Sequence, residues 1–367
     1  MIWMLVVLSV YAILQFLVLT FCIQFKWKNW GRQGINECTA SILIPCRNES
    51  RDLPYLLASL EKLDFPSEKL DVWLADDQSS DNTAKILSEW CSKAENRHFI
   101  QISADEEAKY HINGKANALA ILSRKCEGEI LFFTDADCEV PSKWLQEGVR
   151  SFPSDAGMLL GVTQVKSKGL FGKMQEVEWW HTLAIVKVTS DLGMGLTGLG
   201  NNMMVRKAAL IQSGGFESLP DSLTEDLALS RQLVSQGYKV VQQVSPEILA
   251  KTKAERGIKN FLEQRKRWIS GVVSLPWYFQ LLLALELSFY PAIISLTILK
   301  LSLGLSIWGL KLLVQSIFIQ VFASKAGQKV RLYQLYLFDF HQIVTAPLSI
   351  LYYFWPSKIS WKSRTYP

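Results

Sequence analysis

Three short polar segments follow apolar runs that are typical of buried strands. They are residues 46–49, residues 76–81, and residues 135–137, in which two aspartates are one residue apart. Two carboxylates at that spacing repel each other unless a cation lies between them, and aspartate oxygens suit Mg²⁺ or Mn²⁺ bridged to a diphosphate. We therefore expect Asp135 and Asp137 to bind a divalent metal.

The segment 76–81 also permits a simpler interpretation. Asp, Ser and Asn are favoured in turns and at helix N-caps, so this stretch by itself predicts a turn with a cap. Cys46–Glu49 and Asp76–Asp81 gain interest only because each follows a predicted strand.

A fourth segment, Ser222–Asp226, opens a predicted helix. Ser222 and Glu225 have the spacing of a capping box, and acids in a first helical turn suit the helix dipole. The capping box gives no role to Asp226, and the carboxylate of Asp226 can serve as a base.

A fifth segment places Gln264, Arg267 and Trp268 at positions i, i+3 and i+4 of a predicted helix, hence on one face. A guanidinium there can pair with phosphate, and an indole ring can line the bottom of a sugar-binding or lipid-binding site. A membrane-edge helix with interfacial Trp and Arg is the alternative.

Alternating strands and helices are expected to position these residues. The predicted strands are 41–45, 71–75, 98–102 and 129–134, and the predicted helices are 52–62, 81–90 and 115–123. This alternation predicts a largely parallel sheet covered on both faces. Ligands of such sheets bind beyond the carboxyl ends of the strands, so the polar segments should meet at one edge.

One pattern points elsewhere and is set aside. Gly193–Gly198 matches GxGxxG, the dinucleotide-binding fingerprint, which should follow a strand and open a helix. Here the sequence that follows reads as a loop entering a strand, so nicotinamide or flavin binding is not expected.

The chain also predicts membrane segments. Ile2–Phe25 has no charged residue and is long enough to span a bilayer, and it lacks the basic start and cleavage site of a signal peptide. Lys26, Lys28 and Arg32 follow it, which by the positive-inside rule places the next residues in the cytosol.

A second apolar zone covers residues 272–356, with runs at 281–299, 301–323 and 332–355. Charged or polar residues interrupt these runs, namely Glu286, Lys311, Asp339 and His341. If all three runs cross, the basic tail ends outside, against the charge rule, so one of them can instead be re-entrant or interfacial. Two or three C-terminal membrane helices are expected.

Composition excludes other classes. The net charge of +5 is modest, and basic clusters at the membrane edges favour anionic lipid headgroups over nucleic acid. The six cysteines form no CxxC pair, which predicts free thiols and neither a disulfide framework nor a zinc site. No obligate protein partner is evident.

Together these motifs resemble the family 2 glycosyltransferases, in particular the membrane-bound branch with ceramide glucosyltransferase and the hyaluronan and chitin synthases. The resemblance covers residues 38–270 and rests on four motifs in the expected order. These are an aspartate loop (Asp76, Asp77), DxD (Asp135, Asp137), Thr-Glu-Asp (Thr224–Asp226) and QxxRW (Gln264, Arg267, Trp268). It implies a GT-A fold, an α/β Rossmann-like mixed sheet, between an N-terminal anchor at 1–25 and a C-terminal membrane region at 272–356.

The resemblance also implies a donor site. Asp77, with Asp76, would bind the base of a nucleotide sugar, expected to be a UDP-sugar. Arg47 and Glu49 lie on the same edge, and Lys115 matches a family position near the nucleotide. Asp135 would act through the ribose or the metal.

The remaining implied roles concern the reaction. Asp137 would hold Mn²⁺ or Mg²⁺ on the diphosphate, and Asp226 would take the proton of an acceptor hydroxyl in an inverting transfer. Arg267, from the motif that Gln264 begins, would add positive charge beside the departing diphosphate. Trp268 would line the acceptor side.

The acceptor stays open at this stage. A single transfer to a membrane lipid hydroxyl is favoured, because a polymer channel generally needs more helices. A processive polysaccharide synthase and an inactive assembly subunit are the alternatives. Phe171–Val188 is either an amphipathic helix on the bilayer or an ordinary packing helix. The expected location is the membrane as a multi-pass protein, in a bacterial inner membrane, with the catalytic domain cytosolic.

Overall fold

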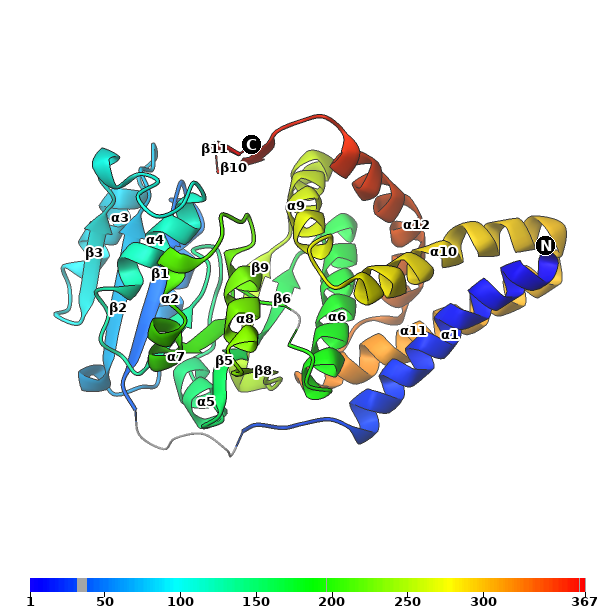
Figure 1. Cartoon of the computed structure of the whole chain (residues 1–367), viewed down its shortest axis with the longest axis horizontal. Coiled ribbons are helices and arrows are strands. Elements are labelled where there is room, and N and C mark those ends of the chain that lie inside the picture. The colour runs from blue at the N-terminus through cyan, green and yellow to red at the C-terminus, as the bar shows by residue number, and fades with distance from the viewer. Residues whose placement is uncertain (32–37, 196, 363, 367) are drawn as a thin grey trace. The chain divides into compact units, whose positions relative to one another are not determined.

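The computed structural model describes residues 1–31, 38–195, 197–362 and 364–366 (Figure 1). Two compact units make up the chain. We call residues 28–165, 189–253 and 358–367 the sheet unit, and residues 1–27, 166–188 and 254–357 the helical unit. Arg32, one of the basic residues of the predicted cytosolic flank, lies outside the described residues.

Within its described residues, the sheet unit contains a seven-stranded mixed sheet in the order β3-β2-β1-β4-β7-β5-β8. The strands are β1 (Ala40–Cys46), β2 (Leu70–Asp76), β3 (Arg97–Gln101), β4 (Ile130–Phe133), β5 (Ala156–Leu160), β7 (Met203–Arg206) and β8 (Lys239–Gln242). The first four strands in this order run parallel, while β7 is antiparallel to both β4 and β5. The predicted α/β sheet is confirmed.

Helices alternate with these strands. They are α2 (Leu53–Leu60), α3 (Thr83–Cys91), α4 (Gly114–Ser123), α5 (Trp144–Arg150), α7 (Lys207–Gln212) and α8 (Glu225–Ser235), with short 3₁₀ turns at Ser67–Lys69, Ala104–Glu106, Phe216–Ser218 and Pro246–Ile248. Ile42, Leu43 and Ile44 of the central strand β1 are wholly buried, as expected for a strand covered on both faces.

Two small sheets complete the strands. β6 (Val162–Lys166) pairs with β9 (Leu249–Lys253), and β10 (Ile359–Trp361) pairs antiparallel with β11 (Arg364–Tyr366) at the C-terminus. The main-sheet elements predicted between residues 41 and 134 all occur within two residues of their predicted ends. All six cysteines are free, as predicted.

The helical unit holds the long helices. They are α1 (Ile2–Phe25), α6 (Leu170–Asp191), α9 (Gly257–Val272), α10 (Trp277–Leu299), α11 (Leu301–Lys325) and α12 (Leu332–Phe354). Among the described residues, α1, α10 and α11 are long and apolar enough to cross a membrane. Helix α12, which carries Asp339 and His341, does not meet that standard.

Helix α12 is held by buried polar contacts. The Asp339 carboxylate forms an ion pair with Lys311 of α11 and accepts hydrogen bonds from Tyr290 (3.0 Å) and Trp308 (2.6 Å). Lys311 and Asp339 are both nearly inaccessible to solvent. This cluster fixes α12 against α10 and α11, because separating the pair would strand a buried charge.

Helix α6 is a packing helix. Trp180 and His181 lie in ring contact with Phe322 and Phe318 of α11, and His181 also contacts Phe16 of α1. Even its polar Lys187 is buried. Of the two interpretations of Phe171–Val188, the packing helix is therefore the one that the structure supports.

Candidate active site

The aspartate loop lies at the carboxyl end of β2. Asp76 is fully buried, and its Oδ2 accepts a hydrogen bond from Ser79 N at 3.1 Å. Asp81 accepts one from Thr83 N at 3.0 Å. The turn-and-cap interpretation thus accounts for Asp81 and for one oxygen of Asp76. It leaves Asp77, and Oδ1 of both Asp76 and Asp77 is buried without a hydrogen-bond partner among the described residues.

The loops after β1 and β2 are joined to each other. Asn48 N donates to Ser79 Oγ at 2.9 Å, and Ser80 N donates to Asn48 Oδ1 at 2.8 Å. Asn48 and Gln78 both adopt left-handed backbone conformations, with φ of 53° and 56°. Such conformations cost about 1–3 kcal/mol each for non-glycine residues and cluster at functional sites.

Arg47 and Glu49 lie on the same edge, as predicted. The Arg47 guanidinium donates to the backbone carbonyl of Asp77, and Asp77 N donates to Cys46 O at 2.8 Å. Glu49 is buried, with its backbone N–H on Thr83 Oγ1 at 2.8 Å. Two loops distant in sequence therefore form one rim.

Lys115 connects the DxD segment to the Thr-Glu-Asp segment. Its Nζ lies 2.7 Å from Asp135 Oδ1 and 3.0 Å from Glu225 Oε1. Asn113 sets up this lysine, because its side chain caps α4 by accepting from Lys115 N at 3.1 Å and donates to Ser222 O at 2.9 Å. Burial lowers the pKa of Lys115, but Asp135, Glu225 and Asp226 together outweigh it and hold the pKa above its usual value.

The predicted capping box at Ser222–Glu225 is wrong. Thr224 is the N-cap of α8 and makes no side-chain cap, while Ser222 Oγ accepts from Thr224 N at 3.1 Å. Glu225 instead turns its buried carboxylate to Lys115. A buried ion pair outweighs a local capping bond here, since an unpaired carboxylate in that position would be costly.

Asp226 is held by two backbone donors. Its Oδ2 accepts from Gly200 N at 2.8 Å and its Oδ1 from Leu227 N at 2.8 Å. Gly198 passes so close that an added Cβ would lie 2.3 Å from the Asp226 carbonyl carbon. The half-buried carboxylate is therefore placed firmly next to the pair of Lys115 and Glu225.

Asp137 faces a lysine that sequence reasoning missed. Lys253, at the end of β9, lies 3.5 Å from Asp137 Oδ2 and 3.8 Å from Glu49 Oε2, and it forms an ion pair with Asp52. An isolated bridge between Glu139 and Lys251 brings β9 to the DxD loop. The two DxD carboxylates thus have one lysine each.

Burial raises the pKa values of three acids in this site. It raises the pKa of Asp77 above the usual value, against the lowering effect of Arg364. Burial and the neighbouring Asp135 raise the pKa of Asp137. The pKa of Glu49 is raised to about 7 by burial, partly offset by Lys362. Burial is the largest cause of each shift and outweighs the lysine or arginine that lies beside each acid.

The DxD pair fits a divalent cation bound together with a substrate. Its carboxylate oxygens are the hard donors that Mg²⁺ and Mn²⁺ prefer. No group of three or more His, Cys, Asp or Glu side chains poised for a metal occurs in the described part of the chain. Asp135 and Asp137 would therefore need further ligands from phosphate oxygens and water, as is usual for Mg²⁺.

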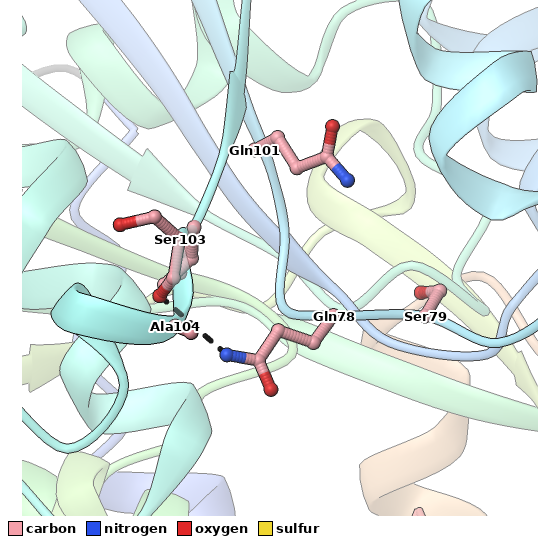
Figure 2. A pocket seen from close by; sticks show the side chains of 6 residues that line it. Gln78, Ser79, Gln101, Ser103 and Ala104 are labelled. Carbon is pink, nitrogen blue, oxygen red and sulfur yellow. Dashed lines mark hydrogen bonds between the residues drawn. The ribbon is translucent and has the colours of Figure 1, made fainter.

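A hollow of about 570 Å³ opens beyond β2 and β3, next in sequence to Asp77 (Figure 2). It is lined by Gln78, Ser79, Gln101, Ile102, Ser103 and Ala104. The Gln78 amide reaches across it to Ser103 O at 3.5 Å. Side-chain amide and hydroxyl groups therefore line a hollow beside the aspartate loop that follows β2.

The QxxRW residues lie on α9 in the helical unit. Gln264 donates to Glu255 at 2.9 Å. The Trp268 ring contacts Trp179, with 4.9 Å between the ring centroids, and the Arg265 guanidinium, 4.2 Å from the Trp268 centroid. Arg265 also pairs with Glu178 at 2.8 Å. The roles expected for Arg267 and Trp268 remain predictions, as does the membrane-edge alternative.

The sheet unit thus brings together its sequence-predicted site residues, which are Arg47, Glu49, Asp76, Asp77, Lys115, Asp135, Asp137 and Asp226. Sequence reasoning missed Asp52 and Lys253 and, in the C-terminal tail, Lys362 and Arg364. The tail cations were visible only as a charge pattern bearing on membrane topology.

Comparisons with known proteins agree with this arrangement. A sequence profile of glycosyl transferase family 21 matches residues 4–367. A beta-monoglucosyldiacylglycerol synthase of Trichormus variabilis is 28% identical over 241 residues, which are 63% of this chain and 48% of that protein. A poly-beta-1,6-N-acetyl-D-glucosamine synthase of Staphylococcus aureus is 26% identical over 235 residues, 63% of this chain and 54% of that protein. The chain spans about half the length of these curated relatives.

The fold also has a solved counterpart. The mannosyltransferase PcManGT of Pyrobaculum calidifontis, solved with GDP-Man and Mn²⁺, superposes with a TM-score of 0.63 at 16% identity, over 97% of this chain and 99% of that one. This likeness concerns the fold alone, and it confirms the predicted GT-A architecture.

Proposed function

The chain belongs to glycosyl transferase family 21, of the same clan as the family 2 enzymes, and on that premise we propose that this glycosyltransferase moves a sugar from a nucleotide sugar to a membrane lipid hydroxyl. One observation carries the proposal. Lys115 joins the DxD carboxylate of Asp135 to Glu225, directly beside Asp226. Groups that can hold a diphosphate and a group that can accept a proton therefore share one site.

The donor would lie along the rim. The nucleobase would enter near Asp77, whose unpartnered Oδ1 can accept an N–H, and the hollow beside Gln78 gives room for it. The diphosphate would lie by Asp135 and Asp137. Lys115 would stay charged and pair with a phosphate oxygen. A UDP-sugar is the donor we propose.

A bound Mn²⁺ or Mg²⁺ would act as a Lewis acid that neutralises the leaving diphosphate. Asp135 and Asp137 are the residues that would hold it. Arg267 is proposed to add positive charge to the same leaving group, in keeping with the family motif.

Asp226 would be the general base. The acceptor oxygen forms a bond to the anomeric carbon from the face opposite the diphosphate, and the bond to the diphosphate breaks. Asp226 takes the hydroxyl proton as this happens. The two backbone N–H groups on its carboxylate keep it oriented for that transfer. The product has the inverted configuration.

A lipid acceptor is favoured over a growing polymer. Two candidate spans follow the catalytic residues in the described chain, which is few for a channel. The Trichormus variabilis relative is named for a glycolipid product. The Staphylococcus aureus relative is named for a polysaccharide, so processive synthesis is the second candidate.

We further propose that the sheet unit is cytosolic. Lys26 and Lys28 follow α1 directly, and two crossings by α10 and α11 would return the chain to the side it left. If α12 does not cross, Lys358, Lys362 and Arg364 also end on the cytosolic side, and the conflict with the charge rule disappears. Protease added to sealed, right-side-out cells should leave residues 38–270 intact, and digestion would reverse this assignment.

The activity is tested by product analysis. Membranes containing the protein are incubated with a panel of labelled nucleotide sugars, and the lipids are separated by chromatography. A labelled glycolipid supports the proposal, a long labelled polymer supports the processive alternative, and no transfer from any donor argues for an inactive assembly subunit.

A further inference from the structure

The C-terminal tail, described at residues 358–362 and 364–366, contacts the rim of the candidate donor site. Arg364 forms an ion pair with Asp77, and its second nitrogen lies 2.9 Å from Glu107. Lys362 forms an ion pair with Glu49, and its carbonyl accepts from Arg47 Nε at 3.0 Å. Two residues near the end of the chain thus bind two acids of the site.

The tail fits this position closely. The Arg364 guanidinium lies over Gly114, where an added Cβ would come within 1.8 Å of its Nη1. Lys362 takes a left-handed conformation, with φ of 48°, between the paired strands β10 and β11. The two cations of the hairpin pair with three carboxylates, those of Glu49, Asp77 and Glu107, and side-chain exposure of Arg364 is only 14%.

These contacts cover the two acids of the rim. With the tail in place, Asp77 is 3% exposed and Glu49 is 6% exposed. A nucleobase that hydrogen-bonds to the Asp77 carboxylate needs access to it, and the Arg364 guanidinium occupies one of its oxygens. With the tail in place Asp77 is almost inaccessible, so a nucleobase reaches its unpartnered Oδ1 only after the tail moves.

We propose that the described tail residues, 358–362 and 364–366, form a cover of the donor site, which competes with the nucleotide for Asp77 and Glu49 and swings away when the donor binds. This inference rests on the proposed donor site at Asp77. The cover pairs with these buried carboxylates while no donor is bound, and a nucleobase N–H takes its place at Asp77 when the donor binds. Donor entry is thereby coupled to release of the tail.

The consequence for affinity is a simple population effect. When only a fraction of molecules has an open site, the apparent dissociation constant is the intrinsic one divided by that fraction. A tail closed in two-thirds to nine-tenths of molecules weakens nucleotide binding about three- to tenfold. Removing its two ion pairs should recover that factor.

The test uses the full chain in detergent micelles, with UDP and Mg²⁺ as the probe and GDP in a parallel titration. The double variant Lys362→Gln/Arg364→Gln is compared with wild type by calorimetry. Lys358→Gln is the matched control, because Lys358 is an exposed cation of the same tail. We expect the double variant to bind one nucleotide about three- to tenfold more tightly, and the control to bind like wild type.

A second measurement needs no variant. Trypsin cleaves after lysine and arginine, so saturating nucleotide should speed cleavage after Lys362 and Arg364 of the wild type several-fold, relative to cleavage after the exposed Lys62. Intact-protein mass spectrometry reads the products. Faster cleavage of the tail supports the cover.

Opposite results would overturn it. Weaker nucleotide binding by the double variant, or protection of the tail by nucleotide, would make the tail a clamp on the donor. Equal binding by all three proteins would show that the tail does not compete, while leaving the donor site intact. Failure of every form to bind either nucleotide would overturn the proposed function, and the cover with it.

Discussion

The ammonium group of Lys115 lies 2.7 Å from the carboxylate of Asp135, at the point where the chain leaves β4. The same nitrogen reaches Glu225 at 3.0 Å, and Glu225 precedes Asp226. One lysine therefore sets the position of the DxD segment relative to the start of α8. This places an acid suited to a metal and an acid suited to proton transfer in a single electrostatic unit.

Lys115→Met should lower both stability and nucleotide affinity. The substitution leaves the buried Glu225 without its counter-ion, with only the Asn113 amide at 3.4 Å, which costs about 3–5 kcal/mol. The double variant Lys115→Met/Glu225→Gln should recover most of the melting temperature but not the affinity, because the phosphate has still lost its lysine. If the double variant also regains wild-type affinity for UDP, Lys115 is structural only.

Asp226→Asn should reduce turnover by about 10²-fold or more while donor affinity stays near that of wild type. The amide cannot accept the proton of the acceptor hydroxyl, whereas the donor is held by Asp77, Asp135 and Asp137. Glu225→Gln is the matched comparison. It should cost less in turnover but more in melting temperature, since Lys115 then lacks a buried anionic partner. Normal turnover by Asp226→Asn would end its assignment as the base.

Activity should require a divalent cation, and Asp137→Ala should abolish it without unfolding the protein. Burial already raises the pKa of Asp137, so its removal relieves a desolvation cost. The measurements are turnover in excess EDTA, with Mn²⁺ added back, and Mn²⁺ binding by electron paramagnetic resonance in the presence of UDP. Full turnover in EDTA would be incompatible with the proposed role of the DxD pair.

Asp339→Ala should strongly destabilise the helical unit. It leaves Lys311 buried without its counter-ion, at a cost of about 3–5 kcal/mol. The double variant Lys311→Met/Asp339→Leu should be much closer to wild type, because replacing both charges by apolar groups removes the desolvation cost. Thermal melting in detergent measures these effects. Equal melting temperatures for wild type and Asp339→Ala would show that the Lys311–Asp339 ion pair does not hold α12 in place.

Local patterns were enough to predict the sheet and its active edge. The apolar run at Ile42–Ile44 and the acids after β2 and β4 each carry a signal within a few residues, so their placement followed from parallel topology. The prediction of a capping box was wrong because it relied on a local pattern alone. The contact that displaced the box joins Glu225 to Lys115, 110 residues earlier in the chain.

The contacts of the C-terminal tail were even less predictable from local sequence patterns. Arg364 and Asp77 are 287 residues apart, and no periodicity relates them. Lys253 was missed because a lysine at a strand end is ordinary until β9 is brought to the DxD loop by its bridge at Glu139. Long-range ion pairs of this kind depend on the assembled fold.

The most direct test of the account is the structure of the product formed by the purified protein in lipid bilayers with a labelled nucleotide sugar. The mass of the lipid product counts the transferred sugars, and nuclear magnetic resonance gives the anomeric configuration. We predict one sugar on a lipid hydroxyl, with the configuration opposite to that in the donor, and loss of this product in Asp226→Asn. A long polymer, or a sugar attached with the donor's configuration, would contradict it.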